Sequence, residues 1–507
     1  AIDHACPHEG YGLTQGDLVG DVLTCAWHNW KFRVTDGACL LGEEAVRTHH
    51  VDVDAAGGVH VTIRPRDPDV DRPKLLASLR RGIERDYLGQ VAREVVRLLQ
   101  LDANPGELVW EAVAHGAPRS EFGWGHAVAS ATDCLSMIDL YEGDQRALPV
   151  VQGIVGLAEN ERDRPVHPLP APASSAAASA SAFRAAVEAE LVGDAQALVL
   201  AAIERGDGPD ELRRWFTAVV SDHHLSYGHG AIYAQKAFEL LAMIGWERAT
   251  VVLPYLVPTI VYGTREDKLP YMRPFVKRLA GVDLAALAAR PAVDGWVDDG
   301  ALAAALLGDD RRAALTATVG ALESGAGVDG VLDTVVDVVS ERMQRYDVAG
   351  EFDFADDFGW LDITHGLTYA NAVRWHHRAA VERDGGTTPD LVRLALFCAF
   401  LAQWTGRHEW HAGIGPRDES VEPLAAGVVA YGEALQRESL LDGTTAFIVH
   451  AHAVKTSRAA AQEAARRDTR EPLDAVARFL AAPRLERFVA ATVERSIDFL
   501  NGRAPRD

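Results

Sequence analysis

Two kinds of hydrophobic patterning divide this chain. Near the amino terminus, short runs alternate apolar and polar residues, as in residues 49–54 and 59–64, which is typical of β-strands with one buried face. From about residue 73 onward, apolar residues recur at helical spacing, beginning with the stripe from Leu76 to Ile83. The pattern predicts a small all-β domain followed by a large all-α domain of repeated helical hairpins.

The repeat in the helical part is a segment that starts with histidine. A small residue follows each histidine, and a hydroxyl-bearing residue stands four positions further on. The four histidines are His126, His229, His365 and His452. Each segment leads into another apolar helix, and these helices are predicted within residues 148–157, 251–262, 391–404 and 485–500. We interpret the segments as helical hairpins arranged in two duplicated halves.

Helical geometry gives this repeat a chemical meaning. Residues four apart lie on one helix face, so each histidine is expected to have a hydroxyl one turn along. These hydroxyls belong to Ser130, Tyr233, Tyr369 and Thr456. A bundle of such helices could direct the four histidines to one central space that holds a metal or a substrate. The alternative is structural, with the histidines as hydrogen-bonding groups in a repeated packing motif.

Breaks in the pattern give the expected domain boundaries. We expect the β domain over residues 1–67, helical repeats over 73–164 and 183–290, and the second helical half over 291–507. Residues 165–182 are rich in Pro, Ala and Ser and lack periodicity, so they are predicted to be a flexible linker.

Composition narrows the function classes. With 507 residues, 48% of them hydrophobic and 24% charged, the chain is typical of a globular protein with a large core. The net charge of −23 argues against nucleic acid and anionic membranes as partners, because phosphate binding needs clustered cations. The most apolar run, residues 249–263, is too short for a membrane span and contains two prolines.

Two of the five cysteines stand close to histidines. The segments read Cys6-Pro7-His8 and Cys25-Ala26-Trp27-His28, with sixteen residues between His8 and Cys25. A structural zinc site would use all four side chains on one ion. An iron–sulfur cluster could instead place the cysteines on one iron and the histidines on the other. Both metals are compatible with this spacing alone.

The segment around these residues resembles the Rieske family. The C-x-H and C-x-x-H motifs, the intervening loop, and the aromatic pair in His28-Asn29-Trp30-Lys31-Phe32 are similar to that family over about residues 1–67. The resemblance implies a [2Fe-2S] cluster whose ligands are Cys6, His8, Cys25 and His28, and one-electron transfer as its chemistry.

Two departures from the Rieske pattern refine this expectation. Respiratory Rieske proteins carry an extra cysteine in each ligand loop, whereas the corresponding places here hold Tyr11 and Trp27. The clamping disulfide is therefore expected to be absent, which is similar to the ferredoxin and oxygenase type and suits the cytoplasm. Family members also have several strands before the first loop, so the domain is expected to be N-terminally truncated.

A cluster needs an electron donor and an acceptor. No G-x-G-x-x-G or Walker A motif is present, so we expect electrons from an external reductase or ferredoxin. The helical domain is hypothesised to bind a small-molecule substrate or additional iron through its four repeated histidines, giving an oxidoreductase such as an oxygenase or oxidase. The competing hypothesis is an electron carrier or redox sensor whose helical part is a binding or assembly module.

Other histidine motifs give further alternatives. His365-Gly366-Leu367-Thr368 is similar to a stretch of questin oxidase-like proteins, which implies oxygenation of aromatic or polyketide-like substrates. The spacing from His224 to His229 resembles part of the mononuclear-iron motif of Rieske oxygenases, but Asp222 stands one position out of place. His408 and His411 could also bind a metal if they lay on a helix.

Overall fold

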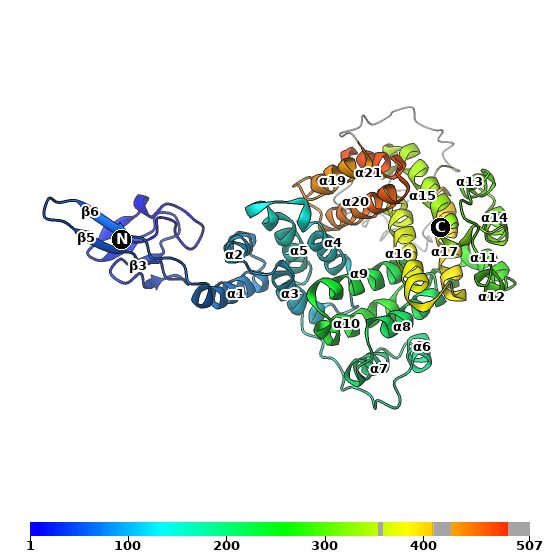
Figure 1. Cartoon of the computed structure of the whole chain (residues 1–507), viewed down its shortest axis with the longest axis horizontal. Helices are drawn as coiled ribbons and strands as arrows, with labels where there is room; N and C mark the ends of the chain where they lie inside the picture. Colours follow the sequence, from blue (N-terminus) through cyan, green and yellow to red (C-terminus); the bar gives the residue numbers. More distant parts are fainter. Residues whose placement is uncertain (353–357, 408, 410–426, 485–507) are drawn as a thin grey trace, which may run out of the picture.

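The computed structural model describes residues 1–352, 358–407, 409 and 427–484. Over these residues the chain has a small β-sheet part at one end and a larger helical part (Figure 1). The fold class predicted from the hydrophobic pattern, a small β domain followed by a predominantly helical remainder, is confirmed.

The β part is built from two antiparallel sheets. Four strands pair in the order β1-β2-β3-β4 and two form a separate hairpin. Their bounds are Asp17–Val19 (β1), Val22–Thr24 (β2), Lys31–Arg33 (β3), Cys39–Leu41 (β4), His50–Val53 (β5) and Val59–Thr62 (β6). Leu23 pairs with Phe32 across β2 and β3, and both side chains pack in a small core that includes Cys6 and Cys25. The two cysteines are therefore fixed by the sheet.

The helical part begins earlier than the pattern predicts. The carboxylate of Asp67 accepts a hydrogen bond from the Asp69 N–H at 3.1 Å and caps a helix whose first residue is Pro68. Proline is well tolerated there because the first N–H groups of a helix have no intrahelical partner. The helix therefore starts five residues before the expected position, and Pro73 lies inside it.

Helices fill the rest of the described chain. The first ten are Pro68–Glu84 (α1), Leu88–Gln100 (α2), Pro105–Gly116 (α3), His126–Ser136 (α4), Ala147–Asn160 (α5), Ala180–Glu188 (α6), Val192–Arg205 (α7), Pro209–Asp222 (α8), His229–Ile244 (α9) and Ala249–Tyr262 (α10). The later ones are Arg273–Leu279 (α11), Leu284–Ala288 (α12), Ala301–Leu307 (α13), Arg311–Glu323 (α14), Gly327–Arg345 (α15), Trp360–Asp384 (α16), Pro389–Trp404 (α17), Val428–Ser439 (α19), Phe447–Arg467 (α20) and Glu471–Ala481 (α21). Three of the apolar helices expected after the histidine segments correspond to α5, α10 and α17. The fourth, at 485–500, lies outside the described residues.

Four of these helices form a closed ring. α4 contacts α9, α9 contacts α16, α16 contacts α20, and α20 contacts α4. Their residues are buried on almost every face, which is the pattern of helices enclosed by other helices. These are the four helices that carry the repeated histidines, so the fold places all four copies around one centre.

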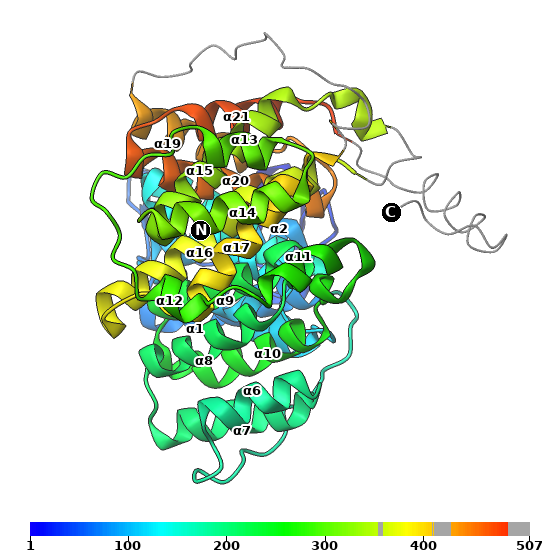
Figure 2. The ribbon, with the colours of Figure 1, turned by 90° about the vertical axis from the view of Figure 1, so that its right-hand side faces the viewer.

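An outer layer covers the ring. α5 packs on α4, α8 and α10 on α9, α15 and α17 on α16, and α19 and α21 on α20. Figure 2 shows α6 and α7 at one edge of this layer, with α19 and α21 at the opposite edge. These outer helices surround the ring, whose central residues His365 and His452 are buried while His126 and His229 are partly exposed.

The stretch predicted as a linker carries no helix up to Ser179, and α6 begins at Ala180. The segment is attached to the helical part by two main-chain bonds. The His167 N–H donates to the Pro118 carbonyl at 2.7 Å, and the Ala173 N–H donates to the Ala197 carbonyl at 2.9 Å. It therefore runs along the surface of the helices between α5 and α6.

No helix within the described residues combines the length and the apolar character that crossing a bilayer requires.

Candidate functional site

The two cysteine loops of the β part share one backbone geometry. The Cys6 N–H donates to the Tyr11 carbonyl at 2.8 Å, and the Cys25 N–H donates to the Trp30 carbonyl at 2.8 Å. In each loop the residue four after the cysteine donates back to the cysteine carbonyl, Gly10 at 2.8 Å and Asn29 at 3.2 Å. These two residues have positive φ angles, 77° and 60°, as such tight loops require. The loops are therefore matched supports for the two motifs.

The two loops bring cysteine next to cysteine and histidine next to histidine. Cys6 and Cys25 are 1% and 2% exposed, and their side chains are hydrogen-bonded to each other. Burial, together with the neighbouring Cys25, raises the pKa of Cys6 to about 11. The rings of His8 and His28 meet edge-on, with centroids 4.5 Å apart. The two cysteine thiols thus lie in the interior of the β part, and the two imidazoles lie nearer its surface.

This donor set fits a [2Fe-2S] cluster with two thiolate and two imidazole ligands. The Nδ1 atom of His8 is buried and has no hydrogen-bond partner in the described part of the chain, as expected for an atom that ligates a metal. The N–H groups of His8 and Glu9 point to the Cys6 sulfur and stabilise its thiolate form. The four residues proposed from the sequence therefore lie together.

The loops are also joined by an aromatic contact. Tyr11 and Trp27 stack with ring centroids 4.3 Å apart, and these are the two positions where respiratory Rieske proteins hold the extra cysteines. The Trp27 indole N–H donates to the Gln15 side chain at 3.1 Å. On the other side, His8 stacks on Trp30 at 4.7 Å.

The imidazole side of these loops faces the helical part. Tyr87, in the turn between α1 and α2, donates a hydrogen bond to Glu9, and its ring centroid is 6.3 Å from that of His8. Ion pairs fix the contact, with Arg85 to Glu43 at 2.7 Å and a second pair between Arg97 and Glu44 at 3.1 Å. The α1–α2 hairpin is therefore the connection between the two parts.

The four repeated histidines converge at the centre of the helix ring. Ring centroids of neighbouring histidines are 4.8 Å apart for His126 and His229, 4.6 Å for His229 and His365, 4.9 Å for His365 and His452, and 4.7 Å for His452 and His126. One nitrogen from each ring lies within 4.8 Å of one from every other ring. Imidazole nitrogens that lie this close together can become ligands of one metal ion.

Hydrogen bonds fix the tautomers of these rings. The Nδ1–H groups of His365 and His452 donate to the carbonyls of Leu361 at 2.5 Å and Ile448 at 2.7 Å, one turn earlier on the same helices. Their Nε2 atoms are therefore lone-pair acceptors when the rings are neutral. The His365 Nε2 nevertheless lies 3.3 Å from the His452 Nε2, so the lone pairs of these two rings face each other, and it lies 2.9 Å from the His229 Nε2, where the direction of the contact depends on the His229 tautomer. Converging lone pairs repel unless a cation lies between them.

The electrostatics keep the cluster neutral. Burial is the main cause that lowers the pKa of all four imidazoles, and the positive charge of Lys455 adds to it. For His365 the pKa falls to about 3. Unprotonated imidazoles whose other nitrogen donates to a carbonyl are the usual form of histidine ligands to metals. The arrangement can therefore bind a metal ion of the kind that prefers imidazole, such as iron, zinc or copper.

Lys455 is the residue that the sequence reasoning missed. It lies one turn after His452 on α20, its side chain is buried, and its Nζ has no hydrogen-bond partner among the described residues. Burial lowers the pKa of its amine to about 7, so the amine changes charge near neutral pH. A lysine among the apolar positions of a helix was the available signal.

The hydroxyls expected one turn along the helices play different parts. Tyr233 reaches across to His126, with its OH 3.2 Å from Nδ1, and its ring stacks on His229. Ser130 instead donates to the Ala127 carbonyl, and Tyr369 stacks on His224. Thr456 has no hydrogen-bond partner in the described part. Of these four hydroxyl-bearing residues, Tyr233 is the one with contacts to the cluster in the described part of the chain.

The other histidine motifs lie elsewhere. His224 is buried between Tyr369 and Phe397 and pairs with Glu266 at 3.2 Å, so it is not part of the four-histidine cluster. The proposed oxygenase-type pair with His229 is therefore not formed. His408 and His411 lie outside the described residues.

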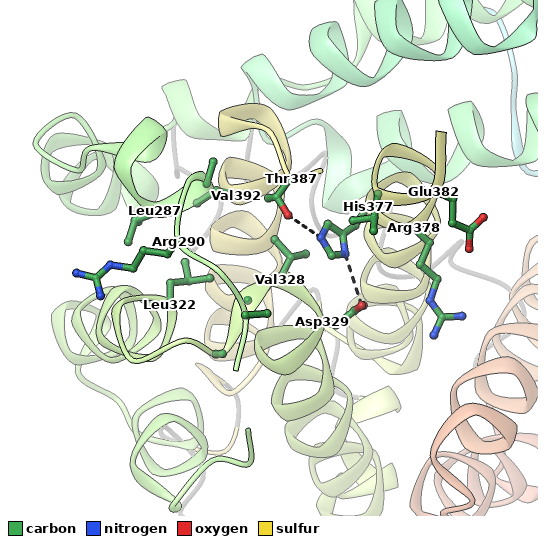
Figure 3. A pocket seen from close by; sticks show the side chains of 15 residues that line it. Leu287, Arg290, Leu322, Val328, Asp329, His377, Arg378, Glu382, Thr387 and Val392 are labelled. Carbon is green, nitrogen blue, oxygen red and sulfur yellow. Dashed lines mark hydrogen bonds and ion pairs between the residues drawn. The ribbon is translucent and has the colours of Figure 1, made fainter. Parts of the chain in front are cut away.

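A separate cavity of about 270 Å³ opens between α12, α14, α15 and α16. Figure 3 shows His377 in its wall, between Thr387 and Asp329. The His377 Nε2 lies 2.9 Å from the Thr387 hydroxyl, and its Nδ1 lies 3.6 Å from the Asp329 carboxylate. The lining is mostly apolar and includes no residue of the four-histidine cluster.

Comparison with known families matches residues 1–52 to the Rieske [2Fe-2S] domain. Comparisons with curated proteins and with solved structures find no match. Residues 1–52 thus match the Rieske [2Fe-2S] domain, and a Rieske domain binds a [2Fe-2S] cluster, which favours this cluster over zinc.

Proposed function

We propose that this protein is an oxidoreductase in which the Rieske domain delivers electrons to a metal ion held by His126, His229, His365 and His452. A Rieske domain implies an electron-transfer role. The observation that carries the proposal further is the convergence of imidazole lone pairs at the ring centre, with two of the tautomers fixed by main-chain carbonyls. We infer that this metal is iron, which makes an oxygenase or oxidase the reaction class.

The residues of the Rieske domain have distinct tasks in this scheme. Cys6 and Cys25 would hold one iron and His8 and His28 the other; when bound, such a cluster supplies one electron at a time. The imidazoles lie toward the surface, where His28 is 40% exposed and can meet an external reductase or ferredoxin. Tyr87 holds Glu9 beside them and keeps this side of the domain against the α1–α2 hairpin.

The helical residues create a largely enclosed metal pocket, in which His365 and His452 are buried and His126 and His229 are partly exposed. Main-chain carbonyls orient the rings of His365 and His452, and Tyr233 contacts the ring of His126. The outer helices limit the access of water, which strengthens electrostatic interactions at the centre. A metal ion in this position would supply a redox-active Lewis acid beside the substrate. The resemblance to questin oxidase-like proteins favours an aromatic or polyketide-like small molecule as that substrate.

Metal analysis tests this proposal directly. The full chain, reconstituted anaerobically with iron and sulfide, should contain the two irons and two sulfides of the cluster and one further iron. Replacing the ligand in His452→Ala should remove the further iron and leave the cluster and its EPR signal intact. His450→Ala is the matched control, because His450 lies on the same helix outside the cluster of histidines.

Two results would overturn the proposal. One is a wild-type protein that holds only the cluster iron after reconstitution, which would favour the electron-carrier or redox-sensor alternative. The other is a further iron that remains bound in His452→Ala and in His365→Ala. Far-ultraviolet circular dichroism of each variant reports that the helical part has folded, which separates loss of the site from loss of structure.

A further inference from the structure

A second set of buried charges lies beyond the four histidines. Asp133 on α4 and Lys236 on α9 each stand seven residues, or about two turns, after the histidine of their helix. The Lys236 Nζ lies 2.9 Å from the Asp133 carboxylate and 2.8 Å from that of Glu239. The three side chains therefore form one chain of contacts.

This chain of contacts leads from the interior to the surface. The side chains of Asp133 and Lys236 are 1% and 6% exposed, whereas that of Glu239 is 22% exposed. Breaking a pair of buried charges costs several kcal/mol, and apolar side chains of similar size could fill the same space at no greater cost. Packing alone therefore gives no reason for an ammonium with two carboxylates at this place.

The inner end of this row of contacts, at Asp133, lies toward the histidine site. Lys455 and Arg458 on α20 and Lys236 and Glu239 on α9 are the charged groups that face Asp133. About one turn after His452 on α20, the Lys455 Nζ and the Thr456 hydroxyl are buried without hydrogen-bond partners among the described residues. Buried polar atoms of this kind are normally satisfied by internal water. Water molecules here would join Asp133 to the site.

A second polar branch starts at Glu239, which accepts a hydrogen bond from the Gln235 amide at 2.9 Å, and it passes through groups that cannot relay protons. Gln235 contacts Asn371 at 3.5 Å, Asn371 donates to Glu463 at 3.1 Å, and Arg374 donates to Glu463 at 2.9 Å and to Asp329 at 2.7 Å. Amides do not titrate, and the arginine guanidinium does not release its proton in proteins. Only the branch through Asp133 and Glu239 consists of groups that can take up and release protons.

We propose that Glu239 and Asp133, held together by Lys236, carry protons from solvent to the four-histidine site. This inference rests on the proposed function, because a buried metal that receives an electron gains negative charge that an incoming proton offsets. In each cycle Glu239 takes one proton from solvent and gives it to Lys236, while the Lys236 ammonium releases another proton to Asp133. Asp133 then releases that proton to the water beside Lys455, and both carboxylates return to their starting state. One proton enters for each electron delivered.

The test uses the full chain loaded with cluster and iron. Electron transfer from the reduced cluster to the iron is followed optically in H2O and D2O. Asp133→Asn should slow this step by about 10²-fold, within the range found for positioned acid–base groups, and Glu239→Gln should also slow it. Asp329→Asn is the matched control, since this carboxylate belongs to the branch that ends in Arg374.

A second readout does not depend on rate. The infrared spectrum recorded during electron transfer in the wild type should contain a transient C=O band of a protonated carboxyl group that shifts in D2O. This band should be absent in Asp133→Asn and present in Asp329→Asn. The double variant Asp133→Asn/Lys236→Met removes both buried charges together and keeps the test valid if Asp133→Asn alone does not fold.

The outcomes separate this inference from the proposed function. A wild-type chain without iron at the four histidines refutes the proposed function. A chain that binds this iron normally, but whose electron-transfer rate, isotope effect and infrared band are unchanged in Asp133→Asn and Glu239→Gln, refutes the proton path alone. An equal effect of Asp329→Asn would also refute it, because the polar layer would then act only through general packing.

Discussion

The buried guanidinium of Arg374 should be one of the strongest single supports of the histidine ring. Its side chain is 3% exposed and donates to Glu463, which is 1% exposed, at 2.9 Å. Further bonds reach Asp329 at 2.7 Å and Asp333 at 2.8 Å. These contacts join α15, α16 and α20, and the last two carry His365 and His452.

Arg374→Met removes the nearest positive charge and leaves the buried Glu463 carboxylate with the Asn371 amide at 3.1 Å and the Arg466 Nε at 3.7 Å. Loss of one partner from a buried ion pair costs about 3–5 kcal/mol. Asp329 and Asp333 are 44% and 30% exposed, so water can solvate them and they add little to this cost. We therefore expect the free energy of unfolding to fall by about 3–5 kcal/mol.

Chemical denaturation followed by far-ultraviolet circular dichroism measures this change. Arg383→Met is the control, because Arg383 is on the same helix and pairs with Asp210 at 2.8 Å, with the two side chains 54% and 47% exposed. Such an exposed pair contributes at most about 1 kcal/mol. Arg374→Met/Glu463→Gln should recover much of the loss. Equal effects of Arg374→Met and Arg383→Met would refute the reasoning.

Three further predictions concern pH, the cluster loops and the metal. Burial lowers the pKa of His376 to about 4, whereas its value in the unfolded state is about 6.5. Between these two pH values the unfolded state binds one more proton than the folded state. The free energy of unfolding therefore falls by up to about 3 kcal/mol as the pH drops from 6.5 to 4. Denaturation curves of His376→Gln should lack this part of the pH dependence, and an unchanged slope would contradict it. Tyr11→Ala should speed the loss of the cluster to a chelator roughly threefold to tenfold, because an aromatic stack contributes about 0.5–1.5 kcal/mol. Phe122→Ala removes an exposed ring outside the Rieske domain and should leave the rate of cluster loss unchanged. Iron added at 100 times its dissociation constant should stabilise the cluster-loaded chain by about 2.7 kcal/mol, seen as a higher thermal midpoint; the same shift in His452→Ala would contradict binding at the four histidines.

Much of the candidate site could be predicted from the sequence because its residues repeat. The same histidine with a small neighbour in four helices indicated a shared environment, and the structure brings these four side chains together. The detail of each copy was harder to predict. His126 and His229 are the first residues of their helices, but α16 and α20 begin five residues before His365 and His452. For α16, the Gly359 N–H bonds to the Asp362 carboxylate at 2.9 Å and sets the earlier start.

Contacts between distant helices could not be predicted in this way. Asp133 and Lys236 are more than one hundred positions apart, and periodicity along one helix does not indicate which helix packs beside it. The small residue after His365 illustrates the same limit. Small neighbours were expected to let backbones approach, yet a Cβ at Gly366 would lie 2.7 Å from the Val339 side chain of α15. The helix outside the ring, not a ring neighbour, requires this glycine.

The stack of Tyr11 on Trp27 has a consequence for the chemistry of the Rieske domain. Where a disulfide ties two ligand loops, the tie is itself a redox couple that thiols can reduce. An aromatic contact between the same two positions holds the loops without accepting electrons. In this protein the iron–sulfur cluster therefore has no competing sulfur couple across its loops, and strongly reducing conditions can change the cluster's charge without untying the loops.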